Sequence, residues 1–248
     1  MKTLYITGAG VSKQSGIPTF RGNDGFWTVG SKNYTPQEMA TRTMYKNHPG
    51  EFLLWYYERF AKYRNIKPNA VHFWLSDKML VTQNIDGLDG KAGNLNYIPI
   101  HGRLDKVTLY HEQGDSVTVM DAPWDEVQKE CPNEENKKKL KNVLLDVFRI
   151  PSKTELPEKM VSLKPFVLLF DEYYTDLYRF QEATSLMKKV DNIIFIGTSF
   201  SVNITNIALE HAFNYNIKVT IVDPLPKKIN FSNVKYYKMS AEEFIRKK

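Results

Sequence analysis

The feature that most constrains the fold is a glycine-rich stretch near the start of the chain. It spans residues 8–22, GAGVSKQSGIPTFRG, and follows Leu4-Tyr5-Ile6, an apolar run that predicts a buried strand over residues 2–7. A strand that turns through glycines into a helix presents backbone N–H groups to an anion. The stretch therefore predicts a phosphate-binding turn, with a helix beginning at residues 9–14. A plain strand–turn–helix corner is the alternative that Gly8-x-Gly10 alone leaves open.

The bulk composition indicates a packed, globular chain. It has 248 residues, of which 42% are hydrophobic and 13% aromatic, enough for one large domain or a domain with a smaller lobe. No apolar run approaches the roughly 20 residues that a membrane-spanning helix needs. Because the first predicted strand begins at residue 2 or 3, we expect no signal peptide and a soluble, cytoplasmic protein.

Cysteine and charge content exclude some sites and leave others open. Cys131 is the single cysteine, which excludes an internal disulfide and a four-cysteine zinc site, and the five histidines show no paired ligand spacing. We therefore expect no metal. The net charge is +6, with basic residues in runs such as 137–141 and 246–248. Solvated helix faces and attraction to acidic partners both account for these runs, and no nucleic-acid motif accompanies them.

Strand and helix signals alternate along the chain, as in an α/β protein. Strands are predicted at residues 79–82, 97–100, 192–196, 218–222 and 236–239, with one or two more between 103 and 119. Helices are predicted to begin at Thr35-Pro36 and at Pro68-Asn69, to run from Pro49 to about Arg64, and to span 134–148 and 241–247. Polar residues follow several of these strands, which is where an open α/β sheet places its ligand.

The glycine-rich stretch resembles the opening of the sirtuin family, the NAD-dependent protein deacylases, which reads Gly-Ala-Gly-x-Ser-x-x-Ser-Gly-Ile-Pro-x-Phe-Arg. Further blocks follow in the family's order: Thr82-Gln83-Asn84-Ile85-Asp86, His101-Gly102, Pro165 to Glu172, and Gly197-Thr198-Ser199 with Val202. Pro68-Asn69-Ala70-Val71-His72 is similar to the family's Pro-Asn-x-x-His segment, and we interpret its His72 as structural. The middle of the chain is not similar, and it lacks the two Cys-x-x-Cys pairs that usually hold zinc in the family.

The resemblance implies a Rossmann-like parallel sheet with helices on both faces and a smaller inserted lobe that lacks the usual zinc ribbon. The nucleotide-binding domain would comprise residues 1–34, 68–102 and 164–248. The small domain would comprise residues 35–67 and 103–163, held by its own apolar contacts.

The resemblance also implies NAD as the cofactor and assigns residues to it. His101 would be the general base, and Asn84 would order the ribose and a water molecule. Asp86 would bind the nicotinamide carboxamide. The cofactor-binding residues would be Gly8, Ala9, Gly10, Ser12, Pro18, Phe20, Arg21, Gln83, Asn84, Asp86, His101, Gly197, Thr198, Ser199 and Asp223. The usual pKa of histidine, about 6.5, suits proton removal at neutral pH.

The implied partner is an acyl-lysine protein or peptide. In the family, the strand that here contains Val167 and Leu168 pairs with the substrate. Tyr56 and Arg59 resemble the Tyr-x-x-Arg pair with which some sirtuins bind acidic acyl groups such as succinyl or malonyl. A surface Arg beside a core Tyr is the equally weighted alternative. Asp171 replaces the family's glycine, so we expect an altered substrate choice there.

The leading functional hypothesis is therefore an NAD-dependent protein-lysine deacylase that produces nicotinamide and 2′-O-acyl-ADP-ribose. A sirtuin-like NAD glycohydrolase or protein ADP-ribosyltransferase is the main alternative, because it needs the same ribose chemistry but not the base. A non-catalytic NAD-sensing module is a third. Retention of His101, Asn84 and Asp86 favours the deacylase.

Overall fold

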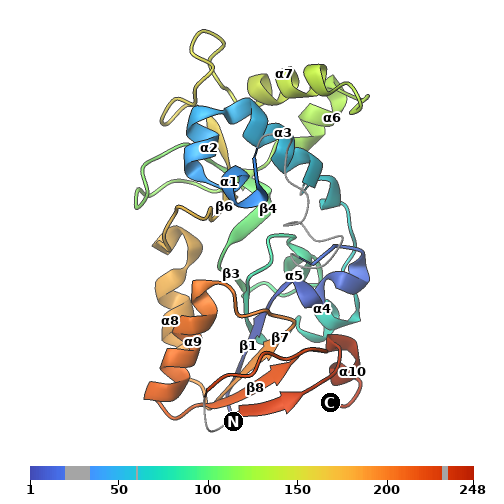
Figure 1. Cartoon of the computed structure of the whole chain (residues 1–248), viewed down its shortest axis with the longest axis vertical. Coiled ribbons are helices and arrows are strands. Elements are labelled where there is room, and N and C mark those ends of the chain that lie inside the picture. The colour runs from blue at the N-terminus through green and yellow to red at the C-terminus, as the bar shows by residue number, and fades with distance from the viewer. Residues whose placement is uncertain (20–33, 60, 231–233) are drawn as a thin grey trace. The chain divides into compact units, whose positions relative to one another are not determined.

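The computed structural model describes residues 1–19, 34–59, 61–230 and 234–248 (Figure 1). The chain forms two compact units, Met1–Thr19 with Ile66–His101 and Tyr178–Lys248, and Phe20–Asn65 with Gly102–Leu177. Their boundaries differ from the expected domains at residues 34, 66–67, 102 and 164–177, of which residues 164–177 group with the second unit. The reason is that β6 (Leu163–Val167) pairs with β4 (Gly102–Leu109).

The first unit is built on a six-stranded parallel sheet. Its strand order is β3-β2-β1-β7-β8-β9. The bounds are Thr3–Thr7 for β1, Met79–Thr82 for β2, Ile98–Pro99 for β3, Asn192–Ile196 for β7, Lys218–Val222 for β8 and Val234–Tyr237 for β9. All five strand pairings are parallel, which confirms the predicted Rossmann-like sheet. The carboxyl ends of β1, β2 and β7 therefore deliver their following residues to one edge of the sheet.

Helices cover both faces of this sheet (Figure 1). On one face α4 (Ala70–Trp74) and α10 (Ala241–Ile245) share an apolar cluster with β7 and β8, in which Ile194 and Phe244 are buried. On the other side α9 (Asn203–Asn214) packs against β8 and alongside α8 (Phe180–Lys188). The fully buried strand β7 lies between these layers, as its uninterrupted apolar run predicts.

The predicted helix over residues 9–14 is wrong. Two 3₁₀ helices form instead, η1 (Ala9–Val11) and η2 (Lys13–Ser15). Gly16 ends the second in a left-handed conformation with φ +85°, which stops helix growth after these short turns.

The second unit contains a three-stranded antiparallel sheet, ordered β5-β4-β6, and a set of helices. β5 spans Met120–Asp121; the helices are α1 (Pro36–Met39), α2 (Arg42–Asn47), α3 (Pro49–Arg59), η3 (Ala61–Tyr63), α6 (Trp124–Glu130) and α7 (Lys137–Val147). The capping box predicted at Thr35 is present, and α7 confirms the amphipathic helix predicted over 134–148. The helix from Pro49 ends earlier than predicted, at Arg59.

The apolar lobe of the second unit, residues 103–163, packs around Trp124. Trp124 is 3% exposed, and its indole Nε1 donates to the Leu104 carbonyl at 2.8 Å. Its ring contacts Tyr56, Tyr57 and Phe148, with centroids 6.1, 5.8 and 5.2 Å away. Within the described residues, no group of three or more His, Cys, Asp or Glu side chains is placed to hold a metal ion. Aromatic contacts thus connect α6 of this lobe with α3 and with the residue that follows α7.

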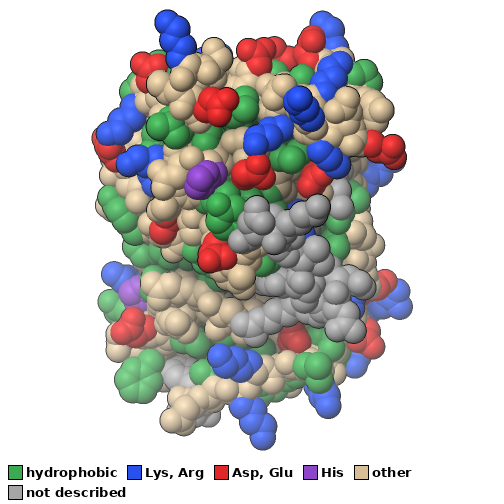
Figure 2. All heavy atoms as spheres, turned by 45° about the horizontal axis from the view of Figure 1, so that its top comes forward, with side chains coloured by type: hydrophobic (Ala, Val, Ile, Leu, Met, Phe, Trp, Pro, Cys, Tyr) green, Lys and Arg blue, Asp and Glu red, His purple; other side chains and the backbone are tan. Residues whose placement is uncertain are grey.

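Charged side chains of both signs are interspersed over the face drawn in Figure 2. On that face the net charge of +6 is not gathered into a single basic surface. No helix in the described ranges is both long and apolar enough to cross a membrane.

Candidate functional site

The turn after β1 and the turn after β7 contact each other through glycines. The Gly8 N–H donates to the Ile196 carbonyl at 3.1 Å, and the Gly10 N–H donates to the Gly197 carbonyl at 2.9 Å. A Cβ on Gly8 would lie 2.8 Å from the Gly197 carbonyl oxygen, and one on Gly10 would lie 2.6 Å from the Gly197 Cα. These glycines are therefore required first to let two strand ends meet, whatever ligand the turn binds.

Ser12 links this turn to the polar residues that follow β2. Its Oγ donates to Asp86 Oδ2 at 2.6 Å and accepts from Asn84 Nδ2 at 3.0 Å. Asn84 Nδ2 also donates to the Gly8 carbonyl at 3.2 Å. Both amide protons of Asn84 are thereby used, and its buried Oδ1 accepts no hydrogen bond from the described residues. One acceptor is left open among otherwise satisfied groups.

His72 joins the same group from α4. Asn69 caps this helix with its side chain, and its backbone N–H donates to His72 Nδ1 at 3.2 Å, so that histidine takes the place of the usual Glu or Gln in a capping box. Since Nδ1 accepts, the proton is on Nε2, which lies 3.4 Å from Ser12 Oγ. Burial lowers the pKa of His72, against the charge of Asp86. The cap contact is consistent with the structural role predicted for His72, which stays a prediction, and we call Ser12, His72, Asn84 and Asp86 the strand-end network.

Asp89 is a buried acid beside this network that the sequence analysis missed. It lies in α5 (Leu88–Lys91) and is 1% exposed. Burial first, and then the charge of Asp86, raise the pKa of Asp89 to about 7. Asp86 and Asp89, two acids three residues apart after a predicted strand, were the sequence signal that could have indicated this buried acid.

His101 follows β3 and is oriented by the end of β2. Its Nδ1 lies 3.0 Å from the Gln83 carbonyl. A carbonyl only accepts, so Nδ1 carries the proton and Nε2 is the basic nitrogen. Burial lowers the pKa of His101 to about 4, although the hydrogen bond to Gln83 opposes this. The ring is therefore neutral, and able to accept a proton, at neutral pH.

The glycine after His101 is fixed by close packing. Gly102 has φ +82°, and a Cβ there would lie 2.0 Å from the Phe166 carbonyl oxygen. His101 is the last residue of its segment in the first unit, and Gly102 is the first residue of the next segment in the second unit. Only glycine fits the backbone conformation and the close contact at position 102.

The remaining cofactor candidates of the first unit lie at the ends of β2, β7 and β8. Gln83 and Thr198 exchange side-chain hydrogen bonds at 3.1 Å. Ser199 and Ser201 hydroxyls lie 2.8 Å apart, and Asp223 Oδ1 accepts from the Leu225 N–H at 2.8 Å. Ala9 begins η1, and Pro18 is half-buried in the loop after η2.

Phe20 and Arg21 lie outside the described residues. Their assignment to NAD stays a prediction.

The candidate acyl clamp lies on α3 of the second unit. Tyr56 is 1% exposed and stacks against Phe52 and Trp124, so its ring belongs to the packed core. Arg59 is half-buried, and its guanidinium lies over the Trp55 ring, 5.9 Å from the centroid. The two residues share a helix but make different contacts, and the clamp stays a prediction.

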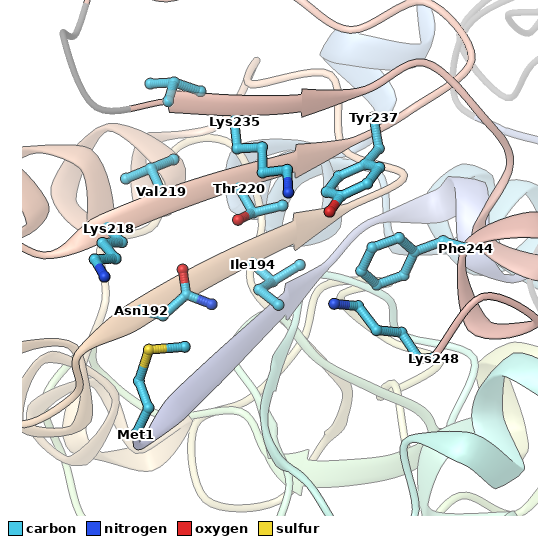
Figure 3. A pocket seen from close by; sticks show the side chains of 11 residues that line it. Met1, Asn192, Ile194, Lys218, Val219, Thr220, Lys235, Tyr237, Phe244 and Lys248 are labelled. Atoms are coloured by element: carbon cyan, nitrogen blue, oxygen red, sulfur yellow. The ribbon is translucent and has the colours of Figure 1, made fainter.

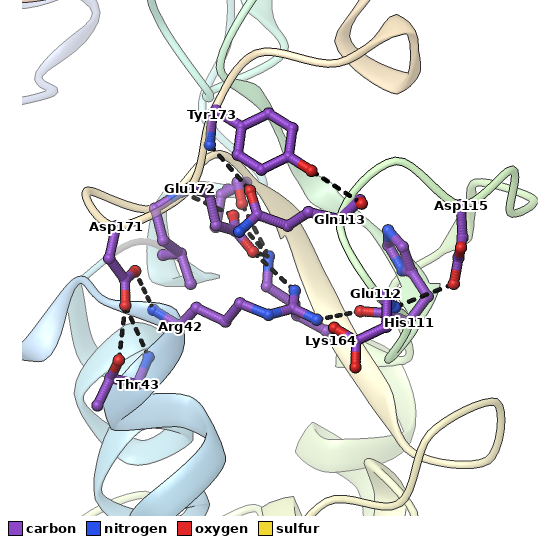
Figure 4. Close-up of polar contacts among 12 residues, drawn as sticks. Arg42, Thr43, His111, Glu112, Gln113, Asp115, Lys164, Asp171, Glu172 and Tyr173 are labelled. Carbon is purple, nitrogen blue, oxygen red and sulfur yellow. Dashed lines mark hydrogen bonds and ion pairs between the residues drawn. The ribbon is translucent and has the colours of Figure 1, made fainter.

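The loop after β6 is held by a buried ion cluster (Figure 4). Glu172 pairs with Lys164 at 3.1 Å and with Arg42 at 3.0 Å, and the three side chains are at most 12% exposed. Burial works to raise the pKa of Glu172, but the charge of Lys164 and hydrogen bonds outweigh it and hold the pKa low. Val167, which ends β6, is buried and Leu168 is half-buried. Their expected pairing with substrate stays a prediction.

Asp171, in the loop after β6, binds the first residues of α2. Its carboxylate accepts from the Arg42 N–H at 2.5 Å, from the Thr43 N–H at 2.9 Å and from the Thr43 hydroxyl at 2.8 Å, so it caps the start of α2 (Figure 4). Burial works against the charged form, but these hydrogen bonds lower the pKa of Asp171. The carboxylate that replaces the family's glycine is thus engaged with α2.

Comparisons with known proteins agree with this fold and these motifs. The sequence profile of the Sir2 family matches residues 8–204. The chain is 31% identical over 257 aligned residues to NAD-dependent protein deacylase 1 of Caldanaerobacter subterraneus subsp. tengcongensis, covering 99% of this chain and 91% of that protein. It is 32% identical over 210 residues to the NAD-dependent protein deacylase of Pyrococcus furiosus, covering 79% of this chain and 71% of that protein. The chain belongs to the Sir2 family.

Solved structures support the Sir2 fold. The structure titled "The Structural basis of Sirtuin Substrate Affinity" superposes with a TM-score of 0.72 at 23% identity, covering 99% of this chain and 92% of that one. A Sir2–p53 peptide–NAD⁺ complex superposes with a TM-score of 0.70 at 23% identity, covering 99% and 91%.

The first unit of this Sir2 chain fits NAD by its own chemistry. The open Oδ1 of Asn84 is a buried acceptor that a ribose hydroxyl would satisfy. Gly8, Ala9, Gly10 and Ser12 would hold the phosphates and adjoining ribose, and Gly197, Thr198, Ser199 and Asp223 the adenosine half.

Proposed function

We propose that this chain is an NAD-dependent protein-lysine deacylase that transfers an acyl group from lysine to ADP-ribose. The observation that carries the proposal is the orientation of His101, whose Nδ1 donates to the Gln83 carbonyl so that Nε2 is the basic nitrogen. A neutral imidazole with a fixed basic nitrogen is what a base step needs. The deacylase names of the relatives in Caldanaerobacter and Pyrococcus support the same activity.

Each side chain of the site has a distinct task in this reaction. NAD, when bound, supplies a ribose that accepts the acyl group as its nicotinamide leaves. His101 Nε2 accepts the proton of a ribose hydroxyl. Ser12 is bonded to Asp86 and Asn84 and keeps those two side chains in one orientation, so the open Oδ1 of Asn84 needs no reorganisation when substrates bind.

Nicotinamide release from NAD tests the proposal, measured with and without acetyl-, succinyl- and longer acyl-lysine peptides. We expect release that depends on an acyl peptide, with equal amounts of free lysine product. Release without any peptide would instead favour an NAD glycohydrolase or ADP-ribosyltransferase. No release under any condition would favour a non-catalytic NAD-sensing module.

The variant His101→Ala separates the base step from NAD binding. We expect deacylation to fall by about 10²–10⁴-fold, the usual contribution of a positioned base, with NAD affinity nearly unchanged. His48→Ala removes an exposed histidine and is the matched control, for which we expect full activity. Deacylation by His101→Ala at the wild-type rate would contradict the assignment.

The acyl preference is a finer proposal, that Tyr56 and Arg59 favour succinyl- or malonyl-lysine over acetyl-lysine. A guanidinium and a phenol together bind a carboxylate well. We expect Arg59→Met to reverse the ratio of kcat/KM values for succinyl and acetyl peptides. Arg246→Met, at an exposed arginine, is the control. An unchanged ratio in Arg59→Met would remove the clamp and leave the deacylase assignment standing.

A further inference from the structure

A cavity of about 510 Å³ lies on one face of the parallel sheet, apart from the glycine turns (Figure 3). Asn192, Ile194, Thr220 and Lys235 form its floor, because the parallel register of β7, β8 and β9 places these residues side by side on the same face. Phe244 and residues after α10 form one wall. None of the strand-end network lines it, so it is a second site on the first unit.

Three lysines give this cavity its charge. Lys218, Lys235 and Lys248 line it, and its lining contains no Asp or Glu. None of the three ammonium groups forms an ion pair within the described part of the chain. The described lining therefore has three lysine ammonium groups and no acidic side chain.

Aromatic rings hold two of these lysines in place. Lys235 Nζ lies over the Tyr237 ring at 4.9 Å from its centroid, and Lys248 Nζ lies over the Phe244 ring at 5.3 Å. A hydrogen bond from Lys235, with the charges of both lysines, lowers the pKa of Tyr237. Figure 3 shows the Lys235 nitrogen beside the Tyr237 ring. Cation–π contacts restrain side chains that would otherwise be highly mobile.

A buried amide without a partner points into the same cavity. Asn192 is 6% exposed, and its side chain makes no hydrogen bond to the described residues (Figure 3). The amide faces the open space of the cavity, so a ligand bound there would supply its hydrogen-bond partner. Thr220, beside it on β8, offers a hydroxyl. The floor thus has donors and an acceptor in addition to the lysine charges.

We propose that this cavity binds a small organic phosphate. A phosphate dianion takes several N–H and O–H donors at once, which the lysines with Asn192 and Thr220 supply. The aliphatic and aromatic parts of the lining, Ile194, Tyr237 and Phe244, suit a planar organic group next to the phosphate. The volume falls in the range of small-molecule sites, about 300–1,000 Å³, and is too small for a nucleic-acid duplex. A phosphorylated nucleoside and a phosphorylated aromatic share this chemistry.

Chemical-shift mapping of the full chain tests the proposal with inorganic phosphate, phenyl phosphate and AMP as probes. Residue-resolved shifts distinguish this cavity from the glycine turns, because the two sites share no residue. We expect saturable shifts at the amides of Asn192, Thr220 and Lys235 with both organic phosphates, and weaker binding of inorganic phosphate. A larger response to AMP than to phenyl phosphate would identify a nucleoside ligand; equal responses would indicate any aromatic phosphate. Absence of saturable shifts at these amides with all three probes would overturn the proposal.

Two triple variants that remove the same number of lysine charges show whether the organic phosphates bind in the cavity itself. Lys218→Gln, Lys235→Gln and Lys248→Gln combined should weaken binding of the organic phosphates by at least about tenfold. Lys188→Gln, Lys189→Gln and Lys227→Gln remove three exposed lysines that do not line the cavity and should change binding less than about twofold. Asn192→Asp should weaken binding through charge repulsion alone. Equal loss in both triple variants would mean non-specific attraction and would overturn the proposal, as would tighter binding of a single-stranded oligonucleotide than of AMP.

Discussion

The strand-end network of the first unit and the apolar lobe of the second are stabilised in opposite ways. In the network, Ser12, Asn84 and Asp86 are buried polar groups joined by hydrogen bonds of 2.6 and 3.0 Å. In the lobe, Trp124 and Phe148 are buried among apolar neighbours, with ring centroids 5.2 Å apart. Hydrogen bonds require a particular atom at a particular place, whereas apolar packing requires mainly volume. This difference explains why family motifs are recognisable in one region and absent in the other.

The largest effect is expected at Gly102, where the two units join. Gly102→Ala should lose more than about 4 kcal/mol of stability or fail to fold, because its Cβ would meet the Phe166 carbonyl. Gly93→Ala is the control, since Gly93 has φ +99° but nothing within 4 Å of a Cβ. Gly93→Ala should lose only about 1–2 kcal/mol of stability, because alanine is strained in the left-handed backbone conformation. Thermal unfolding compares the two, and equal losses would mean that backbone conformation rather than close contact fixes this glycine.

The stability of the apolar lobe should depend on the volume of its buried side chains, whereas the strand-end network should not show this dependence. Trp124→Ala should cost about 3–5 kcal/mol by leaving a cavity between α3, α6 and α7. Trp124→Phe keeps most of the ring and should cost less, chiefly the hydrogen bond to Leu104. Urea unfolding of both variants measures the difference. If both substitutions were equally costly, the indole hydrogen bond would dominate, and the contrast between the two regions would weaken.

Asp89 should make the stability of the first unit fall as pH rises. Its folded pKa, about 7, lies above the ordinary aspartate value of 3.8, so its contribution to stability is complete below pH 3.8 and is lost as pH rises through about 7. The loss has an upper bound of roughly 4 kcal/mol, at 1.36 kcal/mol per pKa unit. Relative to wild type, Asp89→Asn should therefore gain stability between pH 5 and pH 8. Unfolding at several pH values checks this.

Asp77→Asn is the control for that pH series. Asp77 is exposed and the hydrogen bond and charge of Lys78 lower its pKa, so its pH effect should be small and of opposite sign. A parallel response of both variants would show that Asp89 is not buried as an acid.

The smallest effect is expected at the cap of α2. Asp171→Ala removes hydrogen bonds to two backbone N–H groups of that helix and should cost about 1 kcal/mol. Asp146→Ala, at an exposed position in α7, should cost nothing measurable. Acyl-peptide kinetics on the same variants would show whether Asp171 also affects substrate choice. A change in substrate preference without any change in stability would contradict the capping role.

The central strands were predictable because burial on both faces leaves an uninterrupted apolar run. The bounds predicted for β2, β7 and β8 agree with the structure residue by residue. The short helices α2, α6 and α8 were not predicted. Of these, α2 has a local Thr41 cap, but its first two N–H groups are bound by Asp171, which is distant in the sequence, and α8 begins after Arg179 in a left-handed conformation. Such starts depend in part on tertiary contacts that no local pattern shows.

The candidate site was predictable to the level of residue identity but not of contacts. Motif residues such as Asn84 and His101 lie at strand ends, as expected. The open oxygen of Asn84, the tautomer of His101 and the raised pKa of Asp89 depend on burial and on carbonyl positions that no spacing encodes. The sequence therefore predicts more of the fold than of the electrostatics of the candidate site.

The contact between Gly8, Gly10 and Gly197 has a consequence for synthesis on the ribosome. The Gly8–Gly10 motif is made early, but β7, one of the two strands beside β1, and the backbone against which its glycines pack emerge about 185 residues later. A nascent chain that stops before β7 has the motif but neither of these partners. The glycine turn after β1 is thus among the last parts of the protein to mature, and incomplete translation products do not contain it in finished form.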